Sequence, residues 1–216
     1  MLKVFLSYHH NARKFAGRVK SCLTGLGMDV FLAHEDVEPS TKWQEEILRS
    51  LRQCDVFIPL LTKSYHKSYR TDQECGIALA LKKDILAVKF TNDPYGFIGK
   101  FQALKARKQL EDTCWKIVHI LASRPAFKRA ARLGAINAFL SSGSFDESGR
   151  RAANLSKLEP FTVSQLRRIV EGGARNSQIY GGWVARDAVK RLIAKSKSKL
   201  KRSLVREFEK RVESWG

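Results

Sequence analysis

Short apolar segments alternate with amphipathic segments along about the first 120 residues of this chain. Residues 3–7, 28–32, 56–61 and 85–90 are rich in apolar, β-branched and aromatic side chains, as β-strands are. The segments between them carry apolar residues at helical spacing, and a weak fifth strand is expected within residues 97–110. This alternation predicts an α/β fold with a doubly wound, flavodoxin-like parallel sheet in the strand order 2-1-3-4-5.

The most apolar of these segments, residues 56–61, is typical of a central parallel strand that is covered on both faces. Pro59 lies within it. Because proline cannot donate a hydrogen bond to a neighbouring strand, it predicts either a bulge or the end of the strand at this point.

No strand pattern follows Ser123, and apolar residues recur there at helical spacing. The chain is therefore expected to comprise an α/β domain (residues 1–123) and a basic, all-helical domain (residues 124–216). Gly172 and Gly173 are expected to end the helix that starts near residue 162. The polar segment 175–180 is either a recognition loop or a capping turn. The five helices are expected at residues 127–140, 146–158, 162–173, 179–193 and 200–212.

The charge of the chain is concentrated in its second part. Residues 124–216 contain 21 basic and 8 acidic residues, a net charge of +13, out of +19 for the whole chain. An excess of this size favours an acidic partner, such as a polyanion or a nucleotide bound to the helical domain. The alternative is a solvated helical surface, since no nucleic-acid-binding motif accompanies the charge.

Several classes of protein are disfavoured by what the sequence lacks. No apolar run approaches the roughly 20 residues of a membrane span, and no secretory signal is visible, so a cytoplasmic protein is expected. The four cysteines lack metal-site spacing, and no carboxylate or cysteine follows His9 and His10 at ligand spacing. No phosphate-binding glycine loop or Ser–His–Asp arrangement is present. We expect neither a metal nor a bound cofactor.

Five short motifs occur in order in the α/β domain. They are VFLSY from Val4, GMDVF from Gly27, WQEEI from Trp43, CDVFIPLL from Cys54, and Ser68 with Glu74 six positions later, followed by GIALA. Together they resemble the TIR (Toll/interleukin-1 receptor) domain family over about residues 1–123. The resemblance is to prokaryotic members that cleave NAD⁺.

The resemblance assigns roles to six residues. Glu74 occupies the position of the catalytic carboxylate, for which the alternative is a solvated, surface-facing helix residue. Contacts to NAD⁺ are implied for Ser7, Tyr8, Trp43, Ser68 and Asp72. Each of these also has a structural alternative: a strand-end cap for Ser7, packing for the two aromatic residues, a helix cap for Ser68 and simple solvation for Asp72.

One carboxylate is chemically sufficient for the cleavage of NAD⁺. The nicotinamide nitrogen is already cationic, so nicotinamide leaves as a neutral molecule and needs no general acid. The ribose passes through an oxocarbenium-like state, as in glycoside cleavage, and a fixed negative charge stabilises that cation.

The resemblance implies an NAD⁺ glycohydrolase or cyclase that acts in bacterial antiphage defence or as an effector. Such domains become active as homo-oligomers, when a loop that corresponds here to residues 33–42 completes the site of the next copy. The first alternative is a scaffold without catalytic activity that binds other TIR domains through the same loop. The second is a polyanion-binding regulator that acts through its basic helical domain.

Overall fold

The computed structural model describes residues 1–32 and 43–215, and the side chain of Trp43 lies outside this description. The chain forms two compact units, Met1–Ile117 and Val118–Gly216. Helix α4 (Leu110–Ser123) runs from the first unit into the second, and the boundary expected from the sequence lies at its end. Within the described ranges, no helix combines the length and apolar character needed to cross a membrane.

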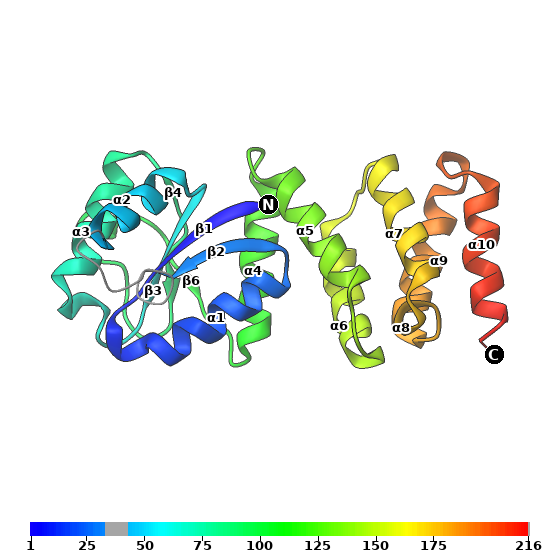
Figure 1. Cartoon of the computed structure of the whole chain (residues 1–216), viewed down its shortest axis with the longest axis horizontal. Coiled ribbons are helices and arrows are strands. Elements are labelled where there is room, and N and C mark those ends of the chain that lie inside the picture. Colours follow the sequence, from blue (N-terminus) through cyan, green and yellow to red (C-terminus); the bar gives the residue numbers. More distant parts are fainter. Residues whose placement is uncertain (33–42, 216) are drawn as a thin grey trace. The chain divides into compact units, whose positions relative to one another are not determined.

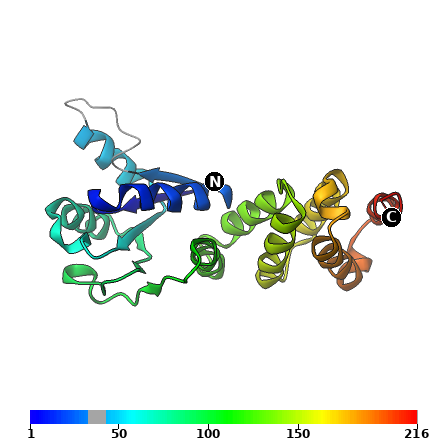
Figure 2. The ribbon, with the colours of Figure 1, turned by 90° about the horizontal axis from the view of Figure 1, so that it is seen from below.

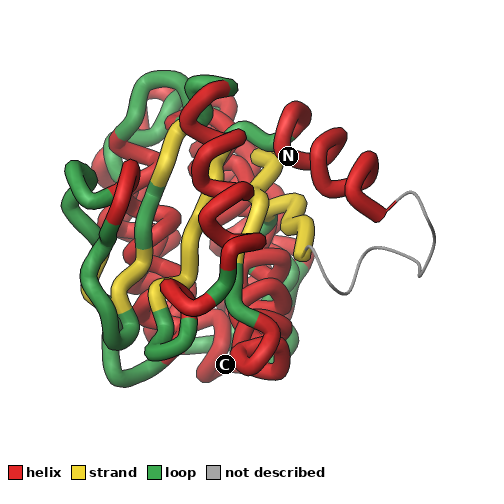
Figure 3. The backbone as a smooth tube through the Cα atoms, turned by 90° about the vertical axis from the view of Figure 1, so that its left-hand side faces the viewer, coloured by secondary structure: helices red, strands yellow, loops and turns green. Residues whose placement is uncertain are grey.

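The first unit is built on one parallel sheet, whose strands lie side by side in Figure 3. The strand order is β2-β1-β3-β5-β6, and β4 also pairs with β3. β4 and β5 are two halves of the expected fourth strand, so the predicted order 2-1-3-4-5 is confirmed, with β6 as the weak fifth strand. The strands are β1 (Leu2–Ser7), β2 (Met28–Leu32), β3 (Val56–Leu61), β4 (Asp84–Ile85), β5 (Val88–Lys89) and β6 (Leu104–Lys105).

Helices follow the strands in the alternation that the sequence predicts (Figure 1). Besides α4, the helices of this unit are α1 (Arg13–Gly25), α2 (Trp43–Gln53) and α3 (Tyr69–Ala80), and its 3-10 turns are η1 (His10–Ala12), η2 (Tyr65–Lys67) and η3 (Gly96–Ile98). The core is centred on β1 and β3. The ring of Phe5 stacks on Phe57 with centroids 5.7 Å apart and contacts Phe31 at 5.2 Å.

Pro59 neither ends β3 nor forms a bulge there, because β3 continues to Leu61 and Pro59 keeps its register with Ser7 of β1. Its effect is on the neighbouring strand instead. The carbonyl of Phe57 accepts a hydrogen bond from the backbone N–H of Leu86, so Pro59, two residues later, has its nitrogen on the same side of β3. Proline has no N–H to continue the ladder, and the break between β4 and β5 lies opposite it.

The second unit is helical, and Figures 1 and 2 show no strand among the described residues after α4. Helix α6 packs on α5 and α9, and α7 packs on α5 and α10. The elements are α5 (Lys128–Leu140), α6 (Phe145–Leu155), η4 (Ser156–Leu158), α7 (Val163–Arg175), α8 (Ser177–Tyr180), α9 (Trp183–Ser196), η5 (Lys197–Lys199) and α10 (Arg202–Glu213).

The expectation that Gly172 and Gly173 end a helix is wrong, since α7 continues through both to Arg175. The glycines serve close packing instead. A Cβ on Gly172 would lie 2.5 Å from the Leu140 side chain, and one on Gly173 would lie 3.3 Å from Phe208. α7 therefore approaches these side chains so closely that an alanine at either position would require them to move.

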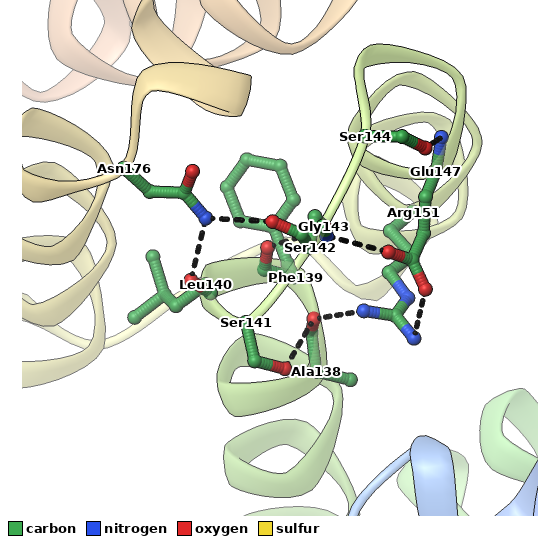
Figure 4. Close-up of polar contacts among 10 residues, drawn as sticks. All are labelled: Ala138, Phe139, Leu140, Ser141, Ser142, Gly143, Ser144, Glu147, Arg151 and Asn176. Atoms are coloured by element: carbon green, nitrogen blue, oxygen red, sulfur yellow. Dashed lines mark hydrogen bonds and ion pairs between the residues drawn. The ribbon is translucent and has the colours of Figure 1, made fainter.

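In the polar segment after α7, Asn176 caps the short helix α8 (Ser177–Tyr180), which supports the capping alternative. Figure 4 draws the contacts of Asn176 with the end of α5. The side-chain carbonyl of Asn176 accepts from the backbone N–H of Gln178 and so caps α8. Its amide nitrogen donates to the backbone carbonyls of Leu140, at 2.9 Å, and Ser142, at 3.0 Å, at the end of α5. Asn176 thus satisfies backbone groups at two helix ends.

The same end of α5 is held from α6 by a second set of contacts (Figure 4). Arg151 donates to the carbonyl of Ala138 at 2.6 Å and pairs with Glu147 at 2.7 Å. Glu147 in turn accepts from the backbone N–H of Gly143 at 2.7 Å. These contacts are consistent with a purely structural role for this part of the helical unit.

Candidate functional site

A serine and a glutamate far apart in the sequence meet at the carboxyl end of β1. Ser7 is the last residue of β1 and Glu74 lies in the second turn of α3. Ser7 Oγ donates a hydrogen bond of 2.5 Å to Glu74 Oε2. Both side chains are buried, and Glu74 is only 6% exposed, so the alternative of a solvated, surface-facing glutamate is wrong.

Tyr65, which the sequence analysis did not select, extends this contact. Its hydroxyl lies 2.8 Å from Ser7 Oγ and 3.3 Å from Cys75 Sγ. Since Ser7 gives its only hydroxyl proton to Glu74, Tyr65 is the donor toward Ser7. Burial raises the pKa of Tyr65 well above its ordinary value, which keeps that proton in place. When Glu74 is a carboxylate, the order of donation is therefore Tyr65 to Ser7 to Glu74.

The ionisation of Glu74 is set mainly by its burial. Removal from water raises the pKa of this carboxyl group from 4.5 to about 7. The Ser7 hydrogen bond and the positive charge of Arg70 act in the opposite direction and favour the carboxylate. Near neutral pH the group is consequently divided between its acid and carboxylate forms, which is typical of functional carboxyls.

Glu74 is also one of the residues that line a pocket of about 230 Å³ between α2 and α3. Ile47, Leu48 and Ile77 supply apolar surface, and the polar groups come from both helices. The complete lining is Gln44, Ile47, Leu48, Arg70, Gln73, Glu74 and Ile77. A pocket with three apolar and four polar or charged lining residues suits a planar ring that carries polar groups.

Two of the predicted contact residues have their hydrogen bonds elsewhere. Ser68 caps α3, its Oγ accepting from the backbone N–H of Thr71 at 3.4 Å. Asp72 is exposed and accepts a hydrogen bond from the Tyr95 hydroxyl. In this structure, neither is hydrogen-bonded to Ser7 or Glu74.

Of the two aromatic residues expected to contact NAD⁺, the structure describes the side chain of Tyr8 but not that of Trp43. Tyr8 is 2% exposed, so its ring lies within the protein. Trp43 begins α2, and its side chain lies outside the described residues, as does the loop of residues 33–42. Of the six residues selected from the sequence, the structure joins Ser7 and Glu74 directly.

The adjacent histidines have local roles. His9 Nδ1 accepts from the backbone N–H of Asn11 at 3.2 Å, and burial lowers the pKa of His9. Among residues 1–32 and 43–215, no three His, Cys, Asp or Glu side chains are grouped so that they could hold a metal ion.

Tyr65 and Arg70 could not be selected from the sequence because their roles depend on the turn that follows β3. Tyr65 lies in η2, directly after the central strand, and Arg70 lies one helical turn before Glu74. The only available indication was position, since loops at the carboxyl ends of parallel strands hold ligands in folds of this kind.

Comparison with known proteins places the first unit within a family. Residues 4–118 match the TIR domain, a span that covers more than half of the 216 residues and includes Ser7, Tyr65 and Glu74. A comparison with curated proteins finds no match for the chain.

Proposed function

The chain belongs to the TIR domain family, and from this premise we propose that it cleaves NAD⁺ between nicotinamide and ribose, with Glu74 as the catalytic residue. One observation carries the proposal. A glutamate that costs free energy to bury lines a pocket and accepts a hydrogen bond from Ser7 at the carboxyl end of the sheet. Buried carboxyl groups with raised pKa values in clefts are concentrated at functional sites.

The chemistry follows from the substrate's own charge. When the bond between ribose C1′ and the pyridinium nitrogen breaks, both bonding electrons go to nitrogen, and nicotinamide leaves as a neutral molecule. The ribose is left with oxocarbenium character, which the carboxylate of Glu74 stabilises. Water then adds to C1′ and loses a proton to solvent, which gives ADP-ribose. No step requires a metal or a cofactor, since NAD⁺ is the substrate.

Substrate binding would also bring Glu74 into its active form. A positive charge near a carboxyl group lowers the pKa of that group. The pyridinium ring in the α2–α3 pocket would thus shift Glu74, whose pKa in the free chain is about 7, toward the carboxylate. Ser7 and Tyr65 act as positioning residues in this account, because their hydrogen bonds fix the orientation of the carboxylate.

The pocket suggests why self-assembly would matter. At about 230 Å³ it accommodates the nicotinamide end of a dinucleotide and not the whole molecule. TIR domains commonly self-associate, and we propose that a second copy completes the site around the rest of NAD⁺.

A role in antiphage defence or as an effector is part of the same proposal, since consumption of NAD⁺ deprives a cell of an essential metabolite.

The test is release of nicotinamide from NAD⁺ by the purified full chain over a wide range of protein concentration. The proposal predicts turnover whose specific activity rises with protein concentration, because the complete site needs two copies. Absence of turnover at every concentration, with self-association intact, would identify the domain as a scaffold instead.

A further inference from the structure

The helical unit contains a groove of about 750 Å³ between α5 and α7. The residues that line the groove come mainly from the N-terminal halves of α5 and α7. The lining residues are Pro125, Lys128, Arg129, Arg132, Leu133, Thr162, Ser164, Gln165, Arg167, Arg168 and Glu171. All of them belong to the second unit, so the groove is independent of the site around Glu74.

The groove is unusually basic for this protein. Five of its lining residues are basic and one, Glu171, is acidic. Two other pockets, one between α9 and α10 and one on α2, are each lined by two basic and two acidic residues. The α5–α7 groove is therefore a local concentration of positive charge, rather than a sample of a uniformly basic surface.

The cations of the groove are available to a ligand. Within the described residues, Lys128, Arg129 and Arg167 form no hydrogen bond or ion pair through their side chains. Two further guanidinium groups are held in place from outside the groove: Arg132 donates to the carbonyl of Pro160 at 2.7 Å, and Arg168 to Asn137 Oδ1 at 2.9 Å. The site thus combines fixed and free cations.

Helix polarity adds to this positive potential. Lys128 and Arg129 begin α5, where a cation opposes the helix dipole, and neither α5 nor α7 has an acidic residue in its first turn. Helix α6 of the same unit has Asp146 and Glu147 there, whereas α9 and α10, like α5 and α7, have no acidic residue in the first turn. The uncompensated first turns of α5 and α7 favour an external anion at the groove.

The lining also indicates which part of a polyanion the groove contacts. Its apolar members are Pro125 and Leu133, and it has no aromatic side chain on which a base could stack. The net charge of +13 over residues 124–216 extends the attraction beyond a single phosphate. We propose that the α5–α7 groove binds the sugar–phosphate backbone of a nucleic acid without base specificity, through Lys128, Arg129, Arg132, Arg167 and Arg168.

The proposal is tested by fluorescence anisotropy with a labelled DNA duplex of mixed sequence and the full-length chain at several salt concentrations. The variant Arg129→Gln/Arg167→Gln removes two exposed cations that have no partner in the described structure. It should bind about tenfold or more weakly, and the slope of log K against log salt should fall by about 0.9 for each phosphate that is no longer neutralised. A thermal melt equal to that of the parent confirms the fold.

The matched control is Lys190→Gln/Lys197→Gln, which removes the same charge from the balanced pocket between α9 and α10. It should bind within about twofold of the parent, and Glu74→Gln should bind the duplex as the parent does, whatever its NAD⁺ turnover. Equal losses in the groove and control variants, or affinity that is flat with salt, would overturn the proposal. Displacement of the duplex by ADP or inorganic phosphate at equal phosphate concentration would also overturn it and identify a small-anion site.

Discussion

At the scale of single residues, the carboxyl group of Glu74 links the proposed activity to stability. It is buried in the folded chain, where its pKa is about 7, whereas an exposed glutamate in the unfolded chain has a pKa near 4.5. The folded state therefore favours the protonated form. The stability that Glu74 contributes is complete below pH 4.5 and is lost as pH rises through about 7.

This linkage predicts a pH dependence that Glu74→Gln removes. A shift of this size corresponds to about 3 kcal/mol of unfolding free energy between acid and alkaline conditions. The Tm of the parent should fall more than that of the variant between pH 5 and pH 8, and at pH 8 the variant should be the more stable of the two. Parallel Tm profiles for the two proteins would contradict the raised pKa.

Tyr65 offers a second test at this scale. Tyr65→Phe removes the hydroxyl that contacts both Ser7 and Cys75 inside the core. Loss of a buried hydrogen bond that leaves its partners unsatisfied costs about 1–3 kcal/mol of unfolding free energy. Urea denaturation measures the change.

Tyr95→Phe is the matched control, since the Tyr95 hydroxyl donates to the exposed Asp72. Its loss should cost less than about 1 kcal/mol. An equal loss of unfolding free energy in the two variants would show that the buried hydrogen bonds of Tyr65 stabilise the fold no more than the exposed one of Tyr95.

At the scale of elements, glycines inside helices have opposite effects in the two units. Gly172→Ala in α7 would place a Cβ 2.5 Å from the Leu140 side chain, and such overpacking costs about 1–3 kcal/mol, against a gain of about 0.5–1 kcal/mol in helix propensity, so a net loss of stability is expected. A Cβ added to Gly76 in α3 would meet no atom within 4 Å, so Gly76→Ala should stabilise its unit by about 0.5–1 kcal/mol. Thermal unfolding should show a lower Tm for Gly172→Ala and a higher Tm for Gly76→Ala. Stabilisation by both substitutions would refute the close packing of α7.

The elements also show how far the sequence determines the fold. The strand order and the helical second unit were predictable, because alternating apolar and amphipathic segments leave few alternatives. The local effects of Pro59 and Gly172 were not, since each depends on a neighbour far away in the sequence. Pro59 interrupts the strand next to its own, and Gly172 accommodates Leu140.

The candidate site divides in the same way. Glu74 and Ser7 were identified through motif spacing, and the structure joins them by a hydrogen bond. Tyr65 and the pocket residues of α2 were missed, because their place beside Glu74 results from the packing of α2 on α3 and from the turn after β3. Motif spacing therefore identified the candidate catalytic residue Glu74, but it did not identify the residues that surround it in the fold.

At the scale of the whole molecule, the two sites that we propose have opposite electrostatic requirements. The first unit holds a buried carboxyl group beside a small pocket, which suits a cationic ring. The second unit carries a basic groove that suits phosphates. On this account a polyanion bound to the second unit would gather copies of the chain and raise the local concentration of the first, which favours assembly of complete sites.

The most direct test of the central claim is nicotinamide release by Glu74→Gln, measured at a concentration that permits self-assembly. Glutamine keeps the volume of the side chain and an acceptor for Ser7 but lacks the negative charge. The account predicts a folded, self-associating protein whose turnover falls by at least about 10²–10³, the usual effect of removing preorganised electrostatic stabilisation. Glu45→Gln, an exposed change on α2, should retain the activity of the parent. Turnover by a folded Glu74→Gln protein at the rate of the parent would contradict the account.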